Sequence, residues 1–369
     1  MARAPDTSVL LHRLRELAGK PQLLGSEWRE LQELARQAAD LVSAAETVKE
    51  EARPGPISLA PPRKMRALRY GRFGGPGVIS LETVPVPEPG PQEVLIKVRA
   101  VGVNPIDWKL REGRYPDRVT LPAIPGADVA GQIAEIGEQV EGWQIGQEVF
   151  GEIRLGACAQ FVVAPIRLLA PMPRSLDFIQ AAGVPLAAMT AWQGLFEHGQ
   201  LESGQTVLIW GAAGGIGHFA VQLAKLRGAH VIGVASRDHL GFIGTLGADE
   251  TLAHDGAEGM ARLRDVDLVL DLVGHPEIQA ASLKALRPGG LLVSTVLLPP
   301  VEEAEWQGVR ARHFMVEPTG ALLRQIARLF DDGKLRVAVT EILPLEEVAR
   351  AHEISQQGHI HGKMVLTVE

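Results

Sequence analysis

The stretch Thr206-Val-Leu-Ile-Trp-Gly-Ala-Ala-Gly-Gly-Ile-Gly217 decides the fold. An apolar run of strand length ends at Gly211, and an amphipathic pattern of helical spacing begins after Gly217. A strand, a glycine turn and a helix in this order predict a dinucleotide site, because the glycines let backbone N–H groups approach a pyrophosphate and the start of a helix attracts that anion. The candidate cofactor-binding residues of this stretch are Gly211, Ala212, Ala213, Gly214, Gly215, Ile216 and Gly217.

Length and composition indicate a globular protein. The chain has 369 residues, of which 46% are hydrophobic and 22% charged, and this suggests two domains plus further segments. A net charge of −7 gives no electrostatic reason to expect nucleic acid or an anionic membrane as a partner. The apolar runs are strand-sized and the N-terminus lacks the apolar core of a signal peptide, so we expect no membrane span.

Cys158 is the only cysteine. A single cysteine excludes an intrachain disulfide and a thiolate zinc cluster. A chain so poor in cysteine is typical of a reducing, cytoplasmic compartment. We expect Cys158 to be a small buried residue rather than a nucleophile.

Residues 1–64 predict a helical extension and a proline-rich linker. One helix is expected from about Ser8 to Gly19, and a second starts at the N-cap Ser26 with apolar positions at heptad spacing. Four prolines within 52–64 predict a stiff, extended connection. The two helices fit a helical hairpin, a coiled-coil dimer arm or a docking element.

The remaining chain predicts an α/β protein of two domains. Residues 65–184 are β-rich, with a clear strand at 93–101 and recurrent turn glycines, which is typical of a small barrel or sandwich. Residues 185–318 alternate strands and helices and predict a doubly wound parallel sheet. Within 319–369 we expect an amphipathic helix and a last strand that returns to the first domain. The strand candidates of the parallel sheet are 206–210, 230–234, 266–270, 290–294 and 312–316.

From Met65 to Glu369 the chain resembles the zinc-free medium-chain dehydrogenase/reductase superfamily, in its quinone-oxidoreductase and enoyl-reductase branch. The landmarks that carry the resemblance are Gly102-Val-Asn-Pro-Ile-Asp-Trp108, Ile124-Pro-Gly-Ala-Asp-Val-Ala-Gly131, Val184-Pro-Leu-Ala-Ala-Met-Thr-Ala-Trp192, Gly211-Ala-Ala-Gly-Gly-Ile-Gly217, Leu246-Gly-Ala-Asp-Glu250, Asp271-Leu-Val-Gly274, Pro288-Gly-Gly290 and Gly362-Lys363. The resemblance implies a GroES-like catalytic domain interrupted by a Rossmann NADP-binding domain, with the cofactor in the cleft between them. Residues 1–64 lie outside it.

Zinc-dependent relatives carry a Cys where Asn104 stands and Gly-His-Glu where Gly126-Ala-Asp128 stands. A catalytic zinc needs three protein ligands and an open position. We therefore expect no metal site, and we interpret His359 and His361 as surface residues rather than ligands.

NADPH is the expected cofactor. The strand at 230–234 is followed by Ala235-Ser236-Arg237 and lacks the acidic residue that would bind the ribose hydroxyls of NAD. Ser236 and Arg237 can donate to a 2′-phosphate, although Asp238 can pair with Arg237 instead. By resemblance, His254 stands near the position of a Tyr that covers this phosphate in many NADPH-using relatives. The resemblance places further cofactor contacts at Thr190, Val273, Phe314, Val316 and Lys363.

Without a metal, the natural hydride acceptor is a quinone or a C=C conjugated to a carbonyl. Hydride addition at the β-carbon forms an enolate that donors must stabilise and an acid must protonate. Enoyl-reductase domains resemble the spacing of Asn104, Asp107 and Tyr115-Pro116, which suggests Tyr115 as the proton donor, Asn104 as a contact of the substrate carbonyl or the nicotinamide ribose, and Asp107 as an anchor. Equally, Tyr115 fits a loop anchor and Asn104 a turn residue before Pro105.

The expected function is thus a cytoplasmic, homodimeric, NADPH-dependent reductase of a small or carrier-bound α,β-unsaturated substrate or a quinone. The arm at 1–51 motivates an alternative, a partner-docked, polyketide-type tailoring protein whose cofactor-binding fold serves a scaffolding or non-reductive role. A mitochondrial presequence is a further reading that Arg3, Arg13 and Arg15 favour and the acidic 27–51 region opposes.

Overall fold

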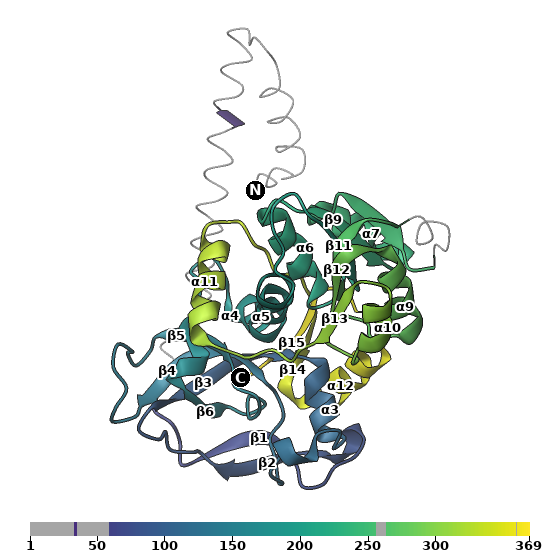
Figure 1. The fold of residues 1–369 in the computed structure, drawn as a ribbon. Helices are drawn as coiled ribbons and strands as arrows, with labels where there is room; N and C mark the ends of the chain where they lie inside the picture. Colours follow the sequence, from purple (N-terminus) through teal and green to yellow (C-terminus); the bar gives the residue numbers. More distant parts are fainter. Residues whose placement is uncertain (1–32, 35–58, 256–262, 359) are drawn as a thin grey trace. The chain divides into compact units, whose positions relative to one another are not determined.

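The computed structural model describes residues 33–34, 59–255, 263–358 and 360–369 (Figure 1). The chain divides into two compact units, Met1–Ser58 and Leu59–Glu369. In the first unit Glu33 and Leu34 are helical, and our other predictions for residues 1–58 lie outside the described part. The second unit is an α/β fold that combines a GroES-like domain with a Rossmann domain. In the described residues no helix is long and apolar enough to cross a membrane.

The Rossmann domain is built on a parallel sheet. Among the described residues this sheet has six strands in the order β10-β9-β8-β11-β12-β13. The chain starts in the middle at β8, builds outward in one direction and then in the other, which is the order of a doubly wound dinucleotide-binding fold. The strands are β8 (Thr206–Trp210), β9 (His230–Ala235), β10 (Glu250–Ala253), β11 (Val266–Asp271), β12 (Leu286–Ser294) and β13 (Arg310–His313).

Two strand predictions need correction. The candidate at 312–316 is wrong in its second half, because β13 ends at His313. The Phe314 N–H still donates to the Ser294 carbonyl at 3.1 Å, but the chain then leaves the sheet toward the helix that begins at Gly320. β10 was absent from our candidates, since it is a four-residue edge strand that is exposed at Glu250 and half-buried elsewhere and carries no continuous apolar run.

Helices cover both faces of this sheet. Alternate strand residues point to opposite faces. Ile209 and Leu270 belong to the apolar cluster that includes residues of α5, α6 and α11, whereas Trp210 and Val269 belong to the cluster that includes residues of α9 and α10, on the other side of the sheet in Figure 1. The helices of this domain are α5 (Pro185–Trp192), the π-helical η4 (Gln193–His198), α6 (Gly217–Leu226), η5 (Arg237–His239), α7 (Leu240–Thr245), α9 (Pro276–Ala285), α10 (Val301–Trp306) and α11 (Gly320–Asp331).

The GroES-like domain is β-rich. Its larger sheet runs β14-β15-β3-β4-β5-β7 with β6 paired to β3, and β1 and β2 form a separate antiparallel pair. Its strands are β1 (Lys64–Tyr70), β2 (Ile79–Pro85), β3 (Glu93–Val103), β4 (Asp128–Ile136), β5 (Glu148–Glu152), β6 (Phe161–Pro165), β7 (Leu169–Pro171), β14 (Val339–Pro344) and β15 (Lys363–Thr367). Its helices are η1 (Pro76–Val78), α3 (Pro105–Arg111), η2 (Pro116–Arg118), η3 (Ile166–Leu168), α4 (Phe178–Ala182), η6 (Leu345–Glu347) and α12 (Val348–Gln357).

The last strand positions the site. β15 pairs antiparallel with β3, with Met364 opposite Val103. Asn104 and Lys363 therefore lie at the same end of the sheet. The Gly362 N–H donates to the Ala213 carbonyl at 2.8 Å, which ties this end to the glycine turn of the Rossmann domain.

A candidate dinucleotide site between the two domains

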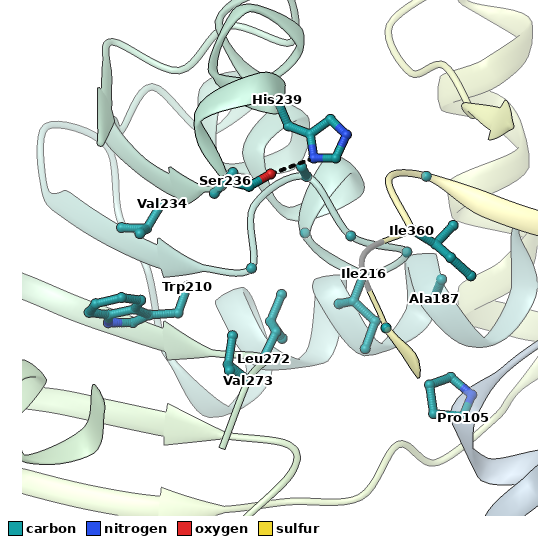
Figure 2. A pocket seen from close by; sticks show the side chains of 18 of the residues that line it. Pro105, Ala187, Trp210, Ile216, Val234, Ser236, His239, Leu272, Val273 and Ile360 are labelled. Carbon is teal, nitrogen blue, oxygen red and sulfur yellow. Dashed lines mark hydrogen bonds between the residues drawn. The ribbon is translucent and has the colours of Figure 1, made fainter. Parts of the chain in front are cut away.

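A cavity of about 840 Å³ lies at the carboxyl ends of β8, β9 and β11 and is lined by residues of both domains. This is the crevice where doubly wound sheets bind ligands. Figure 2 shows the glycine turn between Ser236 and Ile216, with Pro105 and Ile360 entering from the other domain. The predicted site residues that line the cavity are Asn104, Gly211, Ala213, Gly214, Gly215, Ile216, Gly217, Ser236, His254, Val273 and Lys363. Those outside its lining are Asp107, Tyr115, Thr190, Ala212, Arg237, Phe314 and Val316.

Two glycines shape the turn. Gly211 has φ +73°, a left-handed conformation that favours glycine. A Cβ on Gly217 would lie 2.1 Å from the Gly211 carbonyl oxygen, so only glycine lets helix α6 start so close to the end of β8. The backbone N–H groups at the start of α6 and its dipole thereby face the cavity, which is what a pyrophosphate requires. Together with the cavity volume, this backbone fits a nicotinamide dinucleotide.

The floor of the cavity is formed by side chains of the GroES-like domain that are hydrogen-bonded to one another. Lys363 Nζ donates to the Asn104 side-chain oxygen at 2.5 Å and to the Val103 carbonyl at 3.1 Å. Asn104 Nδ2 donates to Asp128 Oδ2 at 2.9 Å, and Asp128 Oδ1 accepts the Leu186 N–H at 3.0 Å. The Asn104 side chain is therefore fixed, with its oxygen toward the ammonium and its nitrogen toward the carboxylate.

Burial dominates the electrostatics of this floor. Asp128 is fully buried, and desolvation raises its pKa to about 6 although Lys363 and Asn104 act in the opposite direction. Asp107 is also buried, and desolvation raises its pKa to about 7 although its Oδ2 accepts the Asn104 N–H at 2.8 Å. Desolvation lowers the pKa of Lys363, and the two aspartates oppose that shift. Asp107 thus serves as a buried partner of Asn104 behind the cavity wall.

The end of β9 differs from our expectation in one residue. Ser236 lines the cavity, and its Oγ lies 2.8 Å from Nδ1 of His239, which also lines it (Figure 2). Arg237 does not line it, because its Nε donates to Asp255 at 3.0 Å and its side chain is 68% exposed. The competing partner that we considered, Asp238, is not the one that Arg237 contacts. In the described geometry His239 takes the place at the cavity that the sequence suggested for Arg237.

The remaining predicted cofactor contacts lie beside the cavity. The Thr190 hydroxyl donates to the Leu186 carbonyl at 2.7 Å within its own helix. Of this helix, Leu186 and Ala187 line the cavity. Phe314 packs its ring on His198 at 4.3 Å between ring centroids. Ala212 is fully buried and its N–H donates to the Val234 carbonyl at 2.9 Å. Val316 is half-buried at the edge of the same core.

Tyr115 lies at the start of η2 and is half-buried. The Arg118 guanidinium lies 5.3 Å from the centroid of its ring, and Arg118 also contacts the Met315 sulfur at 3.4 Å. These contacts connect the loop after α3 with the segment after β13. The role of Tyr115 as a proton donor therefore stays a prediction from sequence spacing.

Sequence reasoning missed several lining residues, among them Trp210, His239 and Ile360. It also missed the structural role of Asp271. Asp271 is fully buried and accepts the N–H groups of Val273 and Gly274, the Ser294 hydroxyl and the Gln279 amide at 2.9–3.0 Å. A single carboxylate thus holds the turn that places Val273 at the cavity. The acidic residue at the end of an apolar strand was the available signal.

Cys158 is buried, as expected, and burial raises its thiol pKa well above the usual value. Within the described residues, no three His, Cys, Asp or Glu side chains meet in a way that could hold a metal ion.

The fold and the cavity define a two-domain dinucleotide-binding protein, and comparison with known proteins places it further. Residues 90–174 match the family described as alcohol dehydrogenase GroES-like domain, and residues 246–366 match the family described as zinc-binding dehydrogenase. The chain is 33% identical to the NADPH-dependent alkenal/one oxidoreductase, chloroplastic, of Arabidopsis thaliana over 83% of this chain and 80% of that protein. It is 36% identical to the spectinabilin polyketide synthase system protein NorB of Streptomyces orinoci over 84% of this chain and 15% of that protein. The structure of the quinone oxidoreductase from Coxiella burnetii has a TM-score of 0.77 at 33% identity and covers 83% of this chain and 100% of that chain.

The chain therefore belongs to the medium-chain dehydrogenase/reductase superfamily, an oxidoreductase family that binds pyridine nucleotides, in its branch of quinone oxidoreductases and enoyl reductases.

Proposed function

We propose that this protein is a zinc-independent, NADPH-dependent reductase of a quinone or of a C=C conjugated to a carbonyl. The observation that carries the proposal is one cavity in which a glycine turn faces a floor that contains the Lys363 ammonium, held in place by the Asn104 side-chain oxygen. When bound, the reduced nicotinamide supplies the hydride. The protein's own residues hold the pyrophosphate at Gly214 to Gly217, exclude water and place a cation near the carbonyl oxygen where negative charge develops.

The preference for NADPH is supported by the end of β9. Ser236 and His239 line the cavity there, and His254 lines it from the end of β10. These side chains can donate hydrogen bonds to a 2′-phosphate, and the cavity-lining residues at the end of β9, Val234, Ala235, Ser236 and His239, carry no carboxylate that would repel it. The name of the Arabidopsis relative includes NADPH, which agrees with this reading.

The test is NADPH oxidation at 340 nm against a quinone, an alkyl enone and a crotonyl thioester, each repeated with NADH. We expect turnover on at least one class and a higher kcat/KM with NADPH. Equal efficiency with both cofactors would contradict the proposed preference. Tight NADPH binding without turnover on any substrate would contradict a reductase.

A second function is supported by the Streptomyces relative, whose name places it in a polyketide synthase system. On this reading the protein acts on a carrier-bound substrate, and residues 1–58, which form a unit of their own, dock a partner or dimerise the enzyme. Deletion of residues 1–58 separates the two readings. A stand-alone reductase keeps its turnover of every substrate after the deletion. A docked protein keeps its turnover of a small enone but loses its turnover of a carrier-bound substrate.

A further inference from the structure

Two buried carboxyl groups lie opposite each other behind the cavity floor. Asp128 on β4 and Glu152 on β5 are direct partners in the antiparallel register, so their side chains share one face of the sheet. Asp128 is fully buried and Glu152 is 5% exposed. Glu152 Oε1 accepts the Arg154 N–H at 2.9 Å, and Asp107 is a third buried acid beside them. Asp128 also holds the Asn104 side chain, whereas Glu152 does not line the cavity.

Two side chains of the cavity lining reach the pair, Asn104 and Lys363, and of these Lys363 is the one with an acidic N–H. Lys363 is 3% exposed, lines the cavity, and has its Nζ 3.9 Å from Asp128 Oδ2. An ammonium has three N–H donors, and two of them are used by Val103 and Asn104. The third is left for Asp128 or for a molecule in the cavity. Lys363 therefore stands between the carboxyl pair and any bound substrate.

The charges of this cluster do not balance when every group is ionised. Asp128 and Asp107 both act on Lys363, and Glu152 adds a third carboxyl group that interacts with both aspartates and with Arg154. Two carboxylates that share a dry site cannot both ionise at ordinary cost. Burial and the charge of Asp128 raise the pKa of Glu152 to about 8, in agreement with this argument. We therefore expect the pair to hold a proton at neutral pH.

We propose that Asp128 and Glu152 form a proton reservoir and that Lys363 delivers its proton to the α-carbon of the reduced substrate. The inference rests on the proposed reductase function and names the proton source of that reaction. It assigns Lys363 a catalytic role and the two carboxyl groups a supply role. It differs from the sequence-based expectation that Tyr115 is the donor, because Tyr115 is not among the residues that line the cavity.

After hydride has added to the β-carbon of the conjugated substrate, the α-carbon carries the electron pair of an enolate. The Nζ–H bond of Lys363 breaks, its electron pair stays on nitrogen, and the proton joins the enolate pair to form the α C–H bond while the carbonyl re-forms. Neutral Lys363 then takes the proton held by Asp128 and Glu152, and water refills the pair.

The reservoir is tested without substrate or cofactor. Infrared spectra of the full chain at pH 7 should contain the C=O stretch of a protonated, buried carboxylic acid. Glu152→Gln should weaken this band, and Asp107→Asn should account for the part that remains, because burial also raises the pKa of Asp107. The matched change Glu82→Gln, at a half-buried acid on β2 that pairs with Arg69, should leave the band in place. A spectrum that lacks the band in the unmodified protein overturns the reservoir, as does a band that neither Glu152→Gln nor Asp128→Asn weakens.

Delivery is tested by rapid-quench single turnovers with saturating NADPH and the best conjugated substrate. Lys363→Met and Glu152→Gln should each slow formation of the saturated product by about tenfold or more. Because Glu152 lies outside the cavity lining, its variant should bind NADPH with unchanged affinity, measured by tryptophan fluorescence. Unchanged rates in both variants overturn the proposed proton transfer from Lys363. The same holds if Tyr115→Phe loses protonation of the product and Lys363→Met does not. Failure of the unmodified protein to reduce any conjugated substrate refutes the proposed function and delivery together, while the infrared band still decides the reservoir.

Discussion

Replacement of Gly217 by Ala tests whether the glycine turn is built for an anion. The new Cβ would lie 2.1 Å from the Gly211 carbonyl oxygen and 2.6 Å from the Ala212 Cα. Ordinary contact begins near 3.4 Å, and both obstacles are backbone atoms, so helix α6 must move away from β8 by more than one ångström. Overpacking of this kind costs about 1–3 kcal/mol of stability. We expect a loss of that size in the free energy of unfolding.

The same movement withdraws the first N–H groups of α6 from the pyrophosphate position. We therefore expect the affinity for NADPH to fall by at least about tenfold, which corresponds to about 1.4 kcal/mol. Trp210 lines the cavity, so a titration followed by tryptophan fluorescence measures the affinity directly. Denaturant unfolding of the free protein measures the stability.

Gly241→Ala is the matched control. Gly241 lies in α7 and a Cβ there would have nothing within 4 Å. Alanine has the better helix propensity, so this change should stabilise the protein by up to about 1 kcal/mol and leave NADPH binding unchanged. If Gly217→Ala behaved like this control in both measurements, the argument from close helix–strand approach would be refuted.

Three further predictions follow from single sites. Ser236→Asp places a carboxylate at the end of β9, where it repels a 2′-phosphate and accepts hydrogen bonds from ribose hydroxyls. The ratio of kcat/KM for NADPH over NADH should therefore fall at least about tenfold, and a constant ratio would show that other residues bind the phosphate. Asp271→Ala leaves two buried side-chain donors and two partly buried backbone N–H groups without their acceptor. Denaturant unfolding should therefore show a loss of about 3 kcal/mol in the free energy of unfolding, and a loss within error would contradict the structural role of this carboxylate. Burial and the neighbouring Arg111 lower the pKa of His352 from 6.5 to about 3. Between these two pH values the unfolded chain binds more protons than the folded chain, so the free energy of unfolding should fall as the pH drops from about 6.5 toward 3. His352→Gln should flatten this dependence in unfolding measured at several pH values, and an unchanged slope would show that His352 is not its cause.

The turn at Gly211 to Gly217 was predictable because its physical reasons are local. Each glycine is required by an atom only a few residues away, as the approach of Gly217 to the Gly211 carbonyl shows. Hydrophobic periodicity likewise predicted β8, β9 and β11, which are short buried runs between turn residues. The same rule failed for β10, which is exposed or half-buried and therefore lacks that signal.

The cavity floor could not be predicted in this way, because its contacts join strands that are distant in the sequence. Lys363 meets Asn104 and Asp128 only because β15 returns to pair with β3, and Glu152 meets Asp128 only through the register of β4 and β5. A motif identifies each residue but not its partner.

Arg237 shows the consequence for function. Its place after β9 suggested a phosphate contact, yet the chain folds Asp255 of the following loop against it and leaves the cavity to Ser236 and His239. The position of a polar residue along a motif therefore indicates which end of the sheet it occupies, whereas its side-chain partner decides whether it is free for a ligand. By that criterion Lys363 is the most informative residue of the site, since its two hydrogen bonds leave one N–H for Asp128 or for a molecule in the cavity.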